Sequence, residues 1–369
     1  MKIKTNKEEI LNSLQVAQYF IASGSTLPLL SNILFEADGD YLNLTATDMD
    51  ISAKIKCKVE NIKEEGKTTI PRKIITLIKE FEDGADITIE SDKNDNISLK
   101  CKKAAYKMPG LPAEDFPALQ LDEKKLESVT ISQALLKEIL DNIQYAALKD
   151  TSKRNLNGVF IKFEGNKIEA VATDAHRLAY YKAETKSPVK GKLDYIIPLK
   201  TINEISRVLN PSDETEITLN FYEKVIEFIF PNMEIVSRVI DENYPNYSQV
   251  IPKDFNMKAL IKKEELASSI RRAAVISSDK SKIVLFKFEN NKLYINVSTA
   301  DEGEAFEEID ITYDGEPIEV SYNAVYIMDF LKANESENIE IKLISSMNPG
   351  VMKAEGKENL TYVIMPIRK

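Results

Sequence analysis

The stretch Ala46-Thr47-Asp48 returns twice along this chain, as Ala172-Thr173-Asp174 and as Thr299-Ala300-Asp301. The three aspartates are 126 and 127 residues apart (174 − 48 and 301 − 174). A similar apolar run ending in Glu precedes each of them, and each unit carries a later landmark that opens a helical stretch. Self-similarity at a domain-sized interval predicts three tandem copies of one structural unit. A soluble chain built in this way is more often a shaped scaffold than an enzyme.

The pattern within each unit is helix, strands, second helix, strands. Apolar residues at helical spacing predict first helices near 7–21, 135–147 and 266–274, and second helices near 74–78, 202–209 and 325–331. Alternating segments such as Ile87-Thr88-Ile89 are typical of half-buried antiparallel strands. We therefore expect an α+β fold of three repeats, each with two helices and antiparallel sheets, and domains at 1–124, 125–252 and 253–369.

Composition narrows the class of protein. Of the 369 residues, 43% are hydrophobic and 29% charged, which suits a folded, soluble protein. The start lacks the apolar core of a signal peptide, and no run of 18 apolar residues predicts a membrane span, so we expect a cytoplasmic protein that does not bind membranes. The net charge of −10 excludes a uniformly basic surface but not a segregated one.

Motifs for cofactors and metals are missing from the sequence. Two distant cysteines and one histidine make a Cys/His metal site improbable, and the cysteines are expected to be buried, reduced thiols. Neither a Walker motif nor a Gly-x-Gly-x-x-Gly motif occurs. We expect no cofactor.

The repeats also supply an internal control, because a residue present in all three units serves the shared fold. The repeated aspartate is therefore interpreted as a turn carboxylate. Only the second unit continues with His176-Arg177-Leu178, and His176 is the single histidine. One reading pairs Asp174 with His176 as in a hydrolase, although no nucleophile motif appears. The other reading is a histidine and an arginine that close a surface groove.

The chain end is the second singular feature. It carries apolar residues up to Ile367, and an apolar terminus is expected to be docked. Met365-Pro366 aligns with Met108-Pro109 of the first unit. The last strand is either a closing edge strand or one wall of an apolar site for a partner.

Together these motifs resemble the bacterial DNA polymerase III beta subunits, the sliding clamps. The similarity rests on the run from Ala172 to Ala179, on Leu156-Asn157-Gly158, on Tyr244-Pro245 with Tyr247, and on the terminal Met365 to Arg368. The resemblance spans the whole chain. It implies a head-to-tail homodimer that closes a ring of six similar domains around duplex DNA, with no catalysis of its own.

The resemblance also implies site residues. It places a groove for short apolar peptides at Leu156, Thr173, His176, Arg177, Leu178, Pro245, Val250, Met347, Val363, Met365, Pro366, Ile367 and Arg368. The cationic residues that would face DNA are Lys73, Lys79, Lys137, Lys153, Arg154, Lys200, Arg207, Arg271, Arg272 and Lys332. The dimer interface would join Tyr106 and Met108 to Val275 and Ile276, with a rim in which Lys73 meets Glu302 or Glu304.

The partners implied are duplex DNA without sequence preference, the DNA polymerase III catalytic subunit, the clamp loader, other polymerases, and mismatch repair and ligase proteins. Two alternatives to a clamp remain open from the residues alone. One is the hydrolase that uses Asp174 and His176. The other is a repeat scaffold that binds peptides but never DNA.

Overall fold

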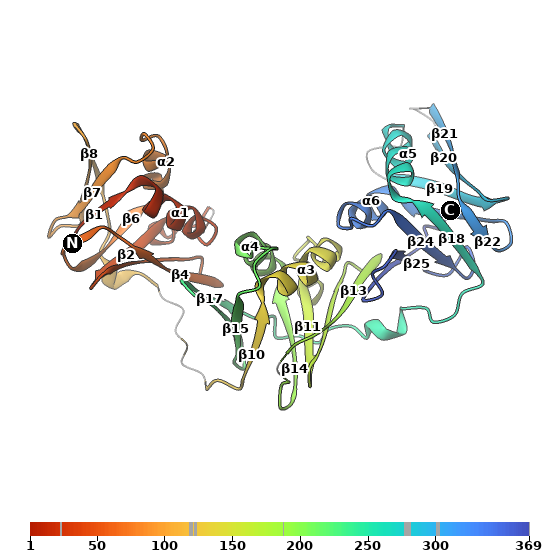
Figure 1. The fold of residues 1–369 in the computed structure, drawn as a ribbon, viewed down its shortest axis with the longest axis horizontal. Helices are drawn as coiled ribbons and strands as arrows, with labels where there is room; N and C mark the ends of the chain where they lie inside the picture. Colours follow the sequence, from red (N-terminus) through yellow and green to blue (C-terminus); the bar gives the residue numbers. More distant parts are fainter. Residues whose placement is uncertain are drawn as a thin grey trace. The chain divides into compact units, whose positions relative to one another are not determined.

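The computed structural model describes residues 1–22, 24–117, 121, 124–186, 188–276, 282–299 and 303–368. Asp301 of the third repeat and Glu302 of the expected interface rim lie outside the described residues. The chain forms two compact units, Met1–Gln133 with Ser212–Val239 and Ala134–Pro211 with Ile240–Lys369 (Figure 1). The division between these units passes through the second repeat, and the three-domain boundaries stay a prediction.

Each repeat contributes two helices, as the apolar spacing predicts. They are α1 (Lys7–Gln18), α2 (Lys73–Lys79), α3 (Gln133–Ile143), α4 (Leu199–Val208), α5 (Lys263–Val275) and α6 (Ala324–Lys332). Each helix buries apolar side chains along one face; in α1, Ile10 and Leu14 are fully buried. Burying one such side chain contributes roughly 1.5–3 kcal/mol, so packing rather than helix propensity holds these short helices.

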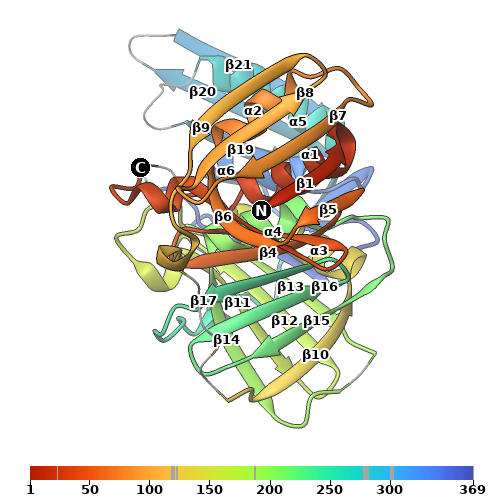
Figure 2. The ribbon, with the colours of Figure 1, turned by 90° about the vertical axis from the view of Figure 1, so that its left-hand side faces the viewer.

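The first unit contains two antiparallel sheets. One runs in the order β5 (Asn61–Glu64), β1 (Lys2–Asn6), β7 (Asp86–Ser91), β8 (Asn96–Cys101) and β9 (Ala104–Pro109). The other runs β10 (Glu127–Ser132), β15 (Glu216–Phe221), β16 (Val225–Phe230), β17 (Met233–Arg238), β4 (Ile51–Lys58), β3 (Tyr41–Thr47), β2 (Asn32–Asp38) and β6 (Gly66–Pro71). Figure 2 shows β17, β16, β15 and β10 side by side.

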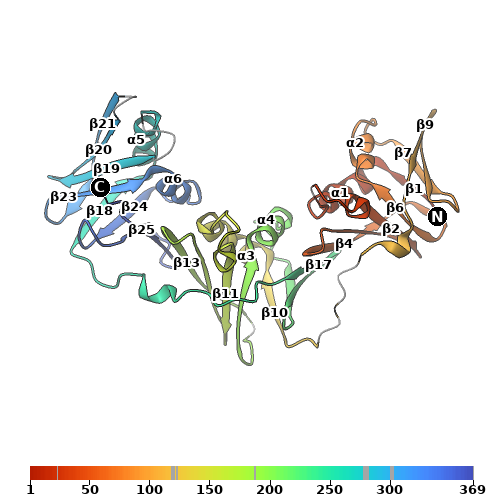
Figure 3. The same ribbon diagram turned by 180° about the vertical axis from the view of Figure 1, so that it is seen from behind.

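The second unit repeats this plan. Its larger sheet runs β14 (Lys192–Pro198), β11 (Gly158–Glu164), β12 (Lys167–Thr173), β13 (Arg177–Glu184), β26 (Leu360–Ile364), β25 (Gly350–Ala354), β24 (Asn338–Leu343), β18 (Met257–Lys262) and β22 (Thr312–Asp314). Its smaller sheet runs β21 (Gly303–Asp310), β20 (Lys292–Thr299), β19 (Ile283–Glu289) and β23 (Ile318–Asn323). In Figure 3, α5 and α6 lie on the same side of β18 and β24.

The Ala-Thr-Asp stretch leads into a turn in the first two repeats, and both turns have the same hydrogen bonds. The Asp48 carboxylate accepts hydrogen bonds from the backbone N–H groups of Asp50 and Ile51, at 3.0 and 2.8 Å. Asp174 accepts the same pair from His176 and Arg177, at 2.9 and 3.0 Å. The turn-carboxylate interpretation is thus confirmed for both aspartates.

The turn also demands an unusual backbone. Met49 has φ 81° and Ala175 has φ 75°, both in the left-handed region that costs an L-residue roughly 1–2 kcal/mol. A threonine two residues earlier holds each backbone in this conformation. The hydroxyl oxygens of Thr47 and Thr173 accept hydrogen bonds from the backbone N–H groups of Met49 and Ala175, both at 3.1 Å. The turn geometry therefore belongs to the fold rather than to either residue type.

Strands of neighbouring repeats are joined by backbone pairing, and both junctions have the same register. In the first, β4 pairs with β17 and sets Ala53 opposite Ile235. In the second, β13 pairs with β26 and sets Ala179 opposite Tyr362. The last strand of the chain is therefore an interior strand. The alternative that it closes the sheet as an edge is wrong, because β25 and β13 flank it on both sides.

Candidate functional site

An apolar cavity of about 200 Å³ opens on the face of the larger sheet in the second unit, where β13 meets β26. Its floor is a cross-strand row in which Val363 lies opposite both Leu178 and Val351. All three side chains are buried, and they form one cluster with Val171. The cavity is lined by Leu156, Thr173, Ala175, Arg177, Leu178, Pro245, Asn246, Tyr247, Val250, Val363 and Met365. We call it the groove.

Tyr247 lines the groove, and a cluster of aromatic rings packs behind it. Phe160 stacks on Tyr244 with ring centroids 5.0 Å apart, and Tyr247 packs against Phe160 and Tyr180 at 5.9 and 5.7 Å. The phenols of Tyr247 and Tyr180 donate to the two carboxylate oxygens of Glu169, at 2.7 and 2.9 Å. Burial raises the pKa of Glu169, but these hydrogen bonds and the nearby charges of Lys162 and Lys182 together hold the pKa below its usual value. The anchored Glu169 carboxylate thus fixes these rings.

Beneath the groove lies a buried arginine. Arg177 donates to Asp174 at 3.0 Å, to Asp329 on α6 at 2.7 Å and to the carbonyl of Tyr145 at 2.7 Å. Its guanidinium carbon is 4.4 Å from the ring centroid of Tyr326. Burial lowers the pKa of Arg177, yet Tyr362 and the two carboxylates raise it above its ordinary value, so the group stays charged. Arg177 therefore ties the second repeat to the third.

The geometry opposes the hydrolase reading. One Asp174 oxygen accepts two backbone N–H groups and the other pairs with Arg177. The His176 ring is exposed and faces Tyr326, with ring centroids 6.5 Å apart. Because the carboxylate is committed elsewhere, it does not orient the imidazole as a triad requires.

The end of the chain is docked, as expected from its apolar sequence. Met365 donates its N–H to the carbonyl of His176 at 2.9 Å, and Ile367 donates to Ser321 at 2.8 Å. The tail beyond β26 thus packs on both repeats, and Met365 forms part of the groove wall.

At the strand junction of the first unit, the row of side chains that corresponds to the groove floor is polar. Ser52 lies opposite Val236 there, where the second unit sets Leu178 opposite Val363. Glu227 takes the next place in the row and accepts buried hydrogen bonds from its neighbours. A polar row cannot form an apolar floor.

Most residues expected for the peptide site line the groove, and several do not. His176, Met347, Pro366, Ile367 and Arg368 lie outside its lining. The sequence reasoning left out Ala175, Asn246 and Tyr247, which do line it. Tyr247 could have been predicted, because it follows Tyr244-Pro245 closely in the sequence and belongs to the same motif. No sequence pattern predicted Ala175, because its position in the groove lining depends on the left-handed backbone of the turn.

The cationic residues expected to meet DNA are exposed with one exception. Lys137 is half-buried, and it bonds to Asp141 on its own helix and to Ser206 on α4, at 2.9 and 2.8 Å. Arg272 and Arg207 are exposed but paired with carboxylates, Glu307 and Glu204. The exposed members on helices or short turns are Lys73, Lys79, Arg154, Lys200, Arg207, Arg271, Arg272 and Lys332, with Lys153 just before one such turn.

The expected interface residues lie at two free sheet edges. Tyr106 and Met108 belong to β9, the last strand of its sheet, and Val275 ends α5 beside β21, which is the edge of another. Val275 is 75% exposed. Phe306 on β21, which the sequence reasoning did not select, is 64% exposed. Apolar side chains this open at a sheet edge indicate a surface made to be covered.

Among the described residues, no three or more His, Cys, Asp or Glu side chains are placed together to hold a metal ion. No helix in this part of the chain is long and apolar enough to cross a membrane.

Comparison with known proteins decides the family. The N-terminal, central and C-terminal domain models of the DNA polymerase III beta subunit match residues 1–120, 130–246 and 248–368. The beta sliding clamp of Caulobacter vibrioides is 30% identical over 375 residues, which cover all of both chains. The chain belongs to the beta sliding clamp family.

Solved clamp structures agree with this assignment. The C. crescentus beta sliding clamp is 28% identical with a TM-score of 0.93, and the match covers 100% of this chain and 99% of that one. In that crystal, polyethylene glycol is bound at a region proposed to tether a beta-motif. The Thermotoga maritima beta subunit is 27% identical with a TM-score of 0.92 and the same coverage. The α+β fold of three repeats is confirmed.

Removing the buried guanidinium tests its structural role in this clamp. In Arg177→Ala, the Asp174 and Asp329 carboxylates lose their partner, and breaking a buried ion pair in this way costs about 3–5 kcal/mol. We expect the urea midpoint of the second unit to fall. The exposed Arg154→Ala is the control and should change the free energy of unfolding by about 0.5 kcal/mol or less. Equal midpoints for the two variants would contradict a structural role for Arg177.

Proposed function

We propose that this chain is a DNA sliding clamp whose two copies close head to tail into a ring around duplex DNA, without catalysis of its own. The observation that carries the proposal is an unfilled strand junction. Within the chain, β4 pairs with β17 and β13 pairs with β26. The equivalent strands of the remaining junction, β21 and β9, are both free edges. In a head-to-tail dimer, β9 of each copy pairs with β21 of the other, and the two contacts close a ring.

The register of that third junction follows from the other two. In each repeat an alanine lies five residues before the last paired residue of the hairpin. The pairs are Ala53 with Lys58, Ala179 with Glu184, and Ala305 with Asp310. Both internal junctions set this alanine opposite the third residue of the strand that it pairs with, which is Ile235 in β17 and Tyr362 in β26. In β9 that third residue is Tyr106.

An antiparallel register with Ala305 opposite Tyr106 sets Glu304 opposite Lys107 of the second copy. Both side chains are exposed, so the pair carries opposite charges at the rim of the contact. Complementary rim charges guide the correct register, while the exposed Val275 and Phe306 supply apolar area.

Charge reversal tests the register. Lys107→Glu sets two carboxylates against each other, and we expect the dimer dissociation constant to rise about tenfold or more in sedimentation equilibrium. Glu304→Lys should do the same, and the double variant should regain the wild-type value. Lys100→Glu, on the adjacent strand β8, is the matched control and should leave the constant unchanged. A double variant as weak as the single ones would contradict this register.

Sequence-independent contact with DNA is consistent with the exposed cations on the helices. A net charge of −10 gives no tight electrostatic grip, so a topological link supports retention while weak phosphate contacts permit sliding. The proposal includes a cytoplasmic location.

Retention on circular DNA tests the function itself. After loading by a clamp loader and ATP onto nicked circular duplex, we expect the protein to stay bound through a wash at about 1 M salt, where the Debye length is only about 3 Å. Cutting the circle should release it. Release from circle and linear DNA alike would favour the peptide-binding scaffold. Lys107→Glu, which weakens ring closure, is the control that should be lost from both.

The groove is proposed to hold a short, extended peptide with apolar anchor side chains. Partners of this kind would be the DNA polymerase III catalytic subunit, the clamp loader, other polymerases, and mismatch repair and ligase proteins. Each buried anchor contributes roughly 1.5–3 kcal/mol, so a few anchors give micromolar affinity, which suits exchanging partners.

Shortening the tail tests the groove. Deleting residues 365–369 removes Met365 from the wall and both backbone bonds of the tail. We expect a peptide with Leu and Phe anchors to bind at least about tenfold more weakly in fluorescence anisotropy, with the dimer mass unchanged. Leu27→Ala, 57% exposed in the first unit, is the control and should bind normally. Undiminished binding by the shortened chain would exclude the tail from the site.

A further inference from the structure

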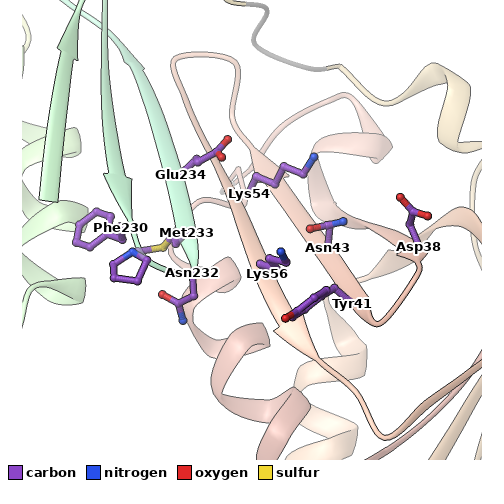
Figure 4. A pocket seen from close by; sticks show the side chains of 10 residues that line it. Asp38, Tyr41, Asn43, Lys54, Lys56, Phe230, Asn232, Met233 and Glu234 are labelled. Carbon is purple, nitrogen blue, oxygen red and sulfur yellow. The ribbon is translucent and has the colours of Figure 1, made fainter. Parts of the chain in front are cut away.

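A second cavity, of about 330 Å³, opens on the larger sheet of the first unit (Figure 4). It lies where the β2–β3 hairpin, β4 and the turn between β16 and β17 meet, so strands of the first and second repeats both line it. The backbone N–H of Lys56 donates to the carbonyl of Asn232 at 2.8 Å, which holds the two sides together. The cavity is thus a fixed part of the sheet.

Two lysines form its positive side. On β4, Ala53, Ile55 and Cys57 are buried, whereas Lys54 and Lys56 are exposed on the opposite face. Within the part of the chain that the structure describes, neither ammonium has a carboxylate within 4.0 Å, although Glu234 lies opposite Lys54 in register. The Lys56 ammonium sits 3.9 Å from the ring centroid of Tyr41.

The repeats show that the fold does not require these lysines. Position by position, Lys54, Lys56 and Lys58 in β4 correspond to residues of β13 and β21, because the three hairpins have matching pairings. The corresponding residues are Tyr180, Lys182 and Glu184 in β13, and Phe306, Glu308 and Asp310 in β21. An unbroken row of lysines therefore belongs to the first repeat alone.

We propose that this cavity binds an acidic segment of a partner protein in extended conformation. Alternate residues of a strand are about 7 Å apart, so Lys54 and Lys56 match alternate carboxylates of an extended chain laid along β4. Figure 4 shows Asn43 and Asn232 at the same cavity, where their amides can bond to peptide backbone groups. Tyr41 adds an apolar surface beside them.

The flanking carboxylates favour a peptide over a nucleic acid. Asp38 and Glu234 lie on either side of the lysines in Figure 4. They would repel a continuous polyanion, which carries a charge on every residue. A peptide with isolated acidic residues can avoid them or pair them with its own cationic groups. This site goes beyond the proposed function and can be tested whether or not the chain encircles DNA.

The test uses the full chain and two labelled probes in fluorescence anisotropy at low salt. The first probe is the capped peptide Glu-Ser-Glu-Ser-Glu, and the second replaces each Glu with Gln. We expect the acidic peptide to bind and the Gln peptide to bind at least fivefold more weakly. The double variant Lys54→Gln/Lys56→Gln should weaken the acidic peptide by about fivefold to tenfold, as loss of two partly exposed ion pairs implies.

The matched control is Lys63→Gln/Lys93→Gln, which removes the same charge from exposed positions outside the cavity. It should bind the acidic peptide as the wild type does. No binding by the wild type, or equal weakening by the two double variants, would overturn the site. A 12-nucleotide single-stranded DNA that binds more tightly than the acidic peptide, and is lost with Lys54 and Lys56, would overturn the assignment to a protein segment.

Discussion

Backbone pairing between strands of different repeats is the interaction on which the rest of this structure depends. Each repeat ends its first hairpin in a strand whose outer edge is unpaired within the repeat, and the last strand of the following repeat covers that edge. An uncovered edge leaves a row of N–H and C=O groups without partners, so covering it is favoured wherever a matching strand is available. Two junctions are filled inside the chain, and the same constraint is the basis of the proposal that a second copy covers the remaining edges, β9 and β21.

The junctions share a backbone but differ in side chains, and the differences separate their uses. Where the first repeat has Ile51 after its turn, the second has Arg177, which draws Asp329 of the third repeat toward it. Where the first has Ser52, the second has Leu178, and the row becomes apolar. One junction is thereby a polar surface with exposed lysines, and the other is a groove held from below by a buried ion cluster. Function follows from substitutions on a constant frame.

Much of the fold could be predicted from sequence, because repetition shows which residues the frame needs. The helices fall where apolar spacing places them, and the repeated aspartate is the turn residue that its recurrence indicated. The groove residues came from a family resemblance and not from periodicity. The sequence reasoning placed Lys137 among the cations that would face DNA, and it could not show that this side chain is half-buried and donates to Ser206 on α4. It also left open an edge position for β26. Contacts between elements distant in sequence decide both points, and no local pattern records them.

The sequence by itself determined three copies of one α+β unit, their helices and strands, and the positions at which one copy departs from the others. Those features depend on local spacing and on comparison between repeats. Only the tertiary structure decided that β26 pairs with β13, that Arg177 lies beneath a groove, and that Lys54 and Lys56 line a cavity together with residues of the second repeat. Pairing register and burial depend on which surfaces meet, and the energy of an ion or an apolar side chain depends on that surrounding rather than on its neighbours in the chain.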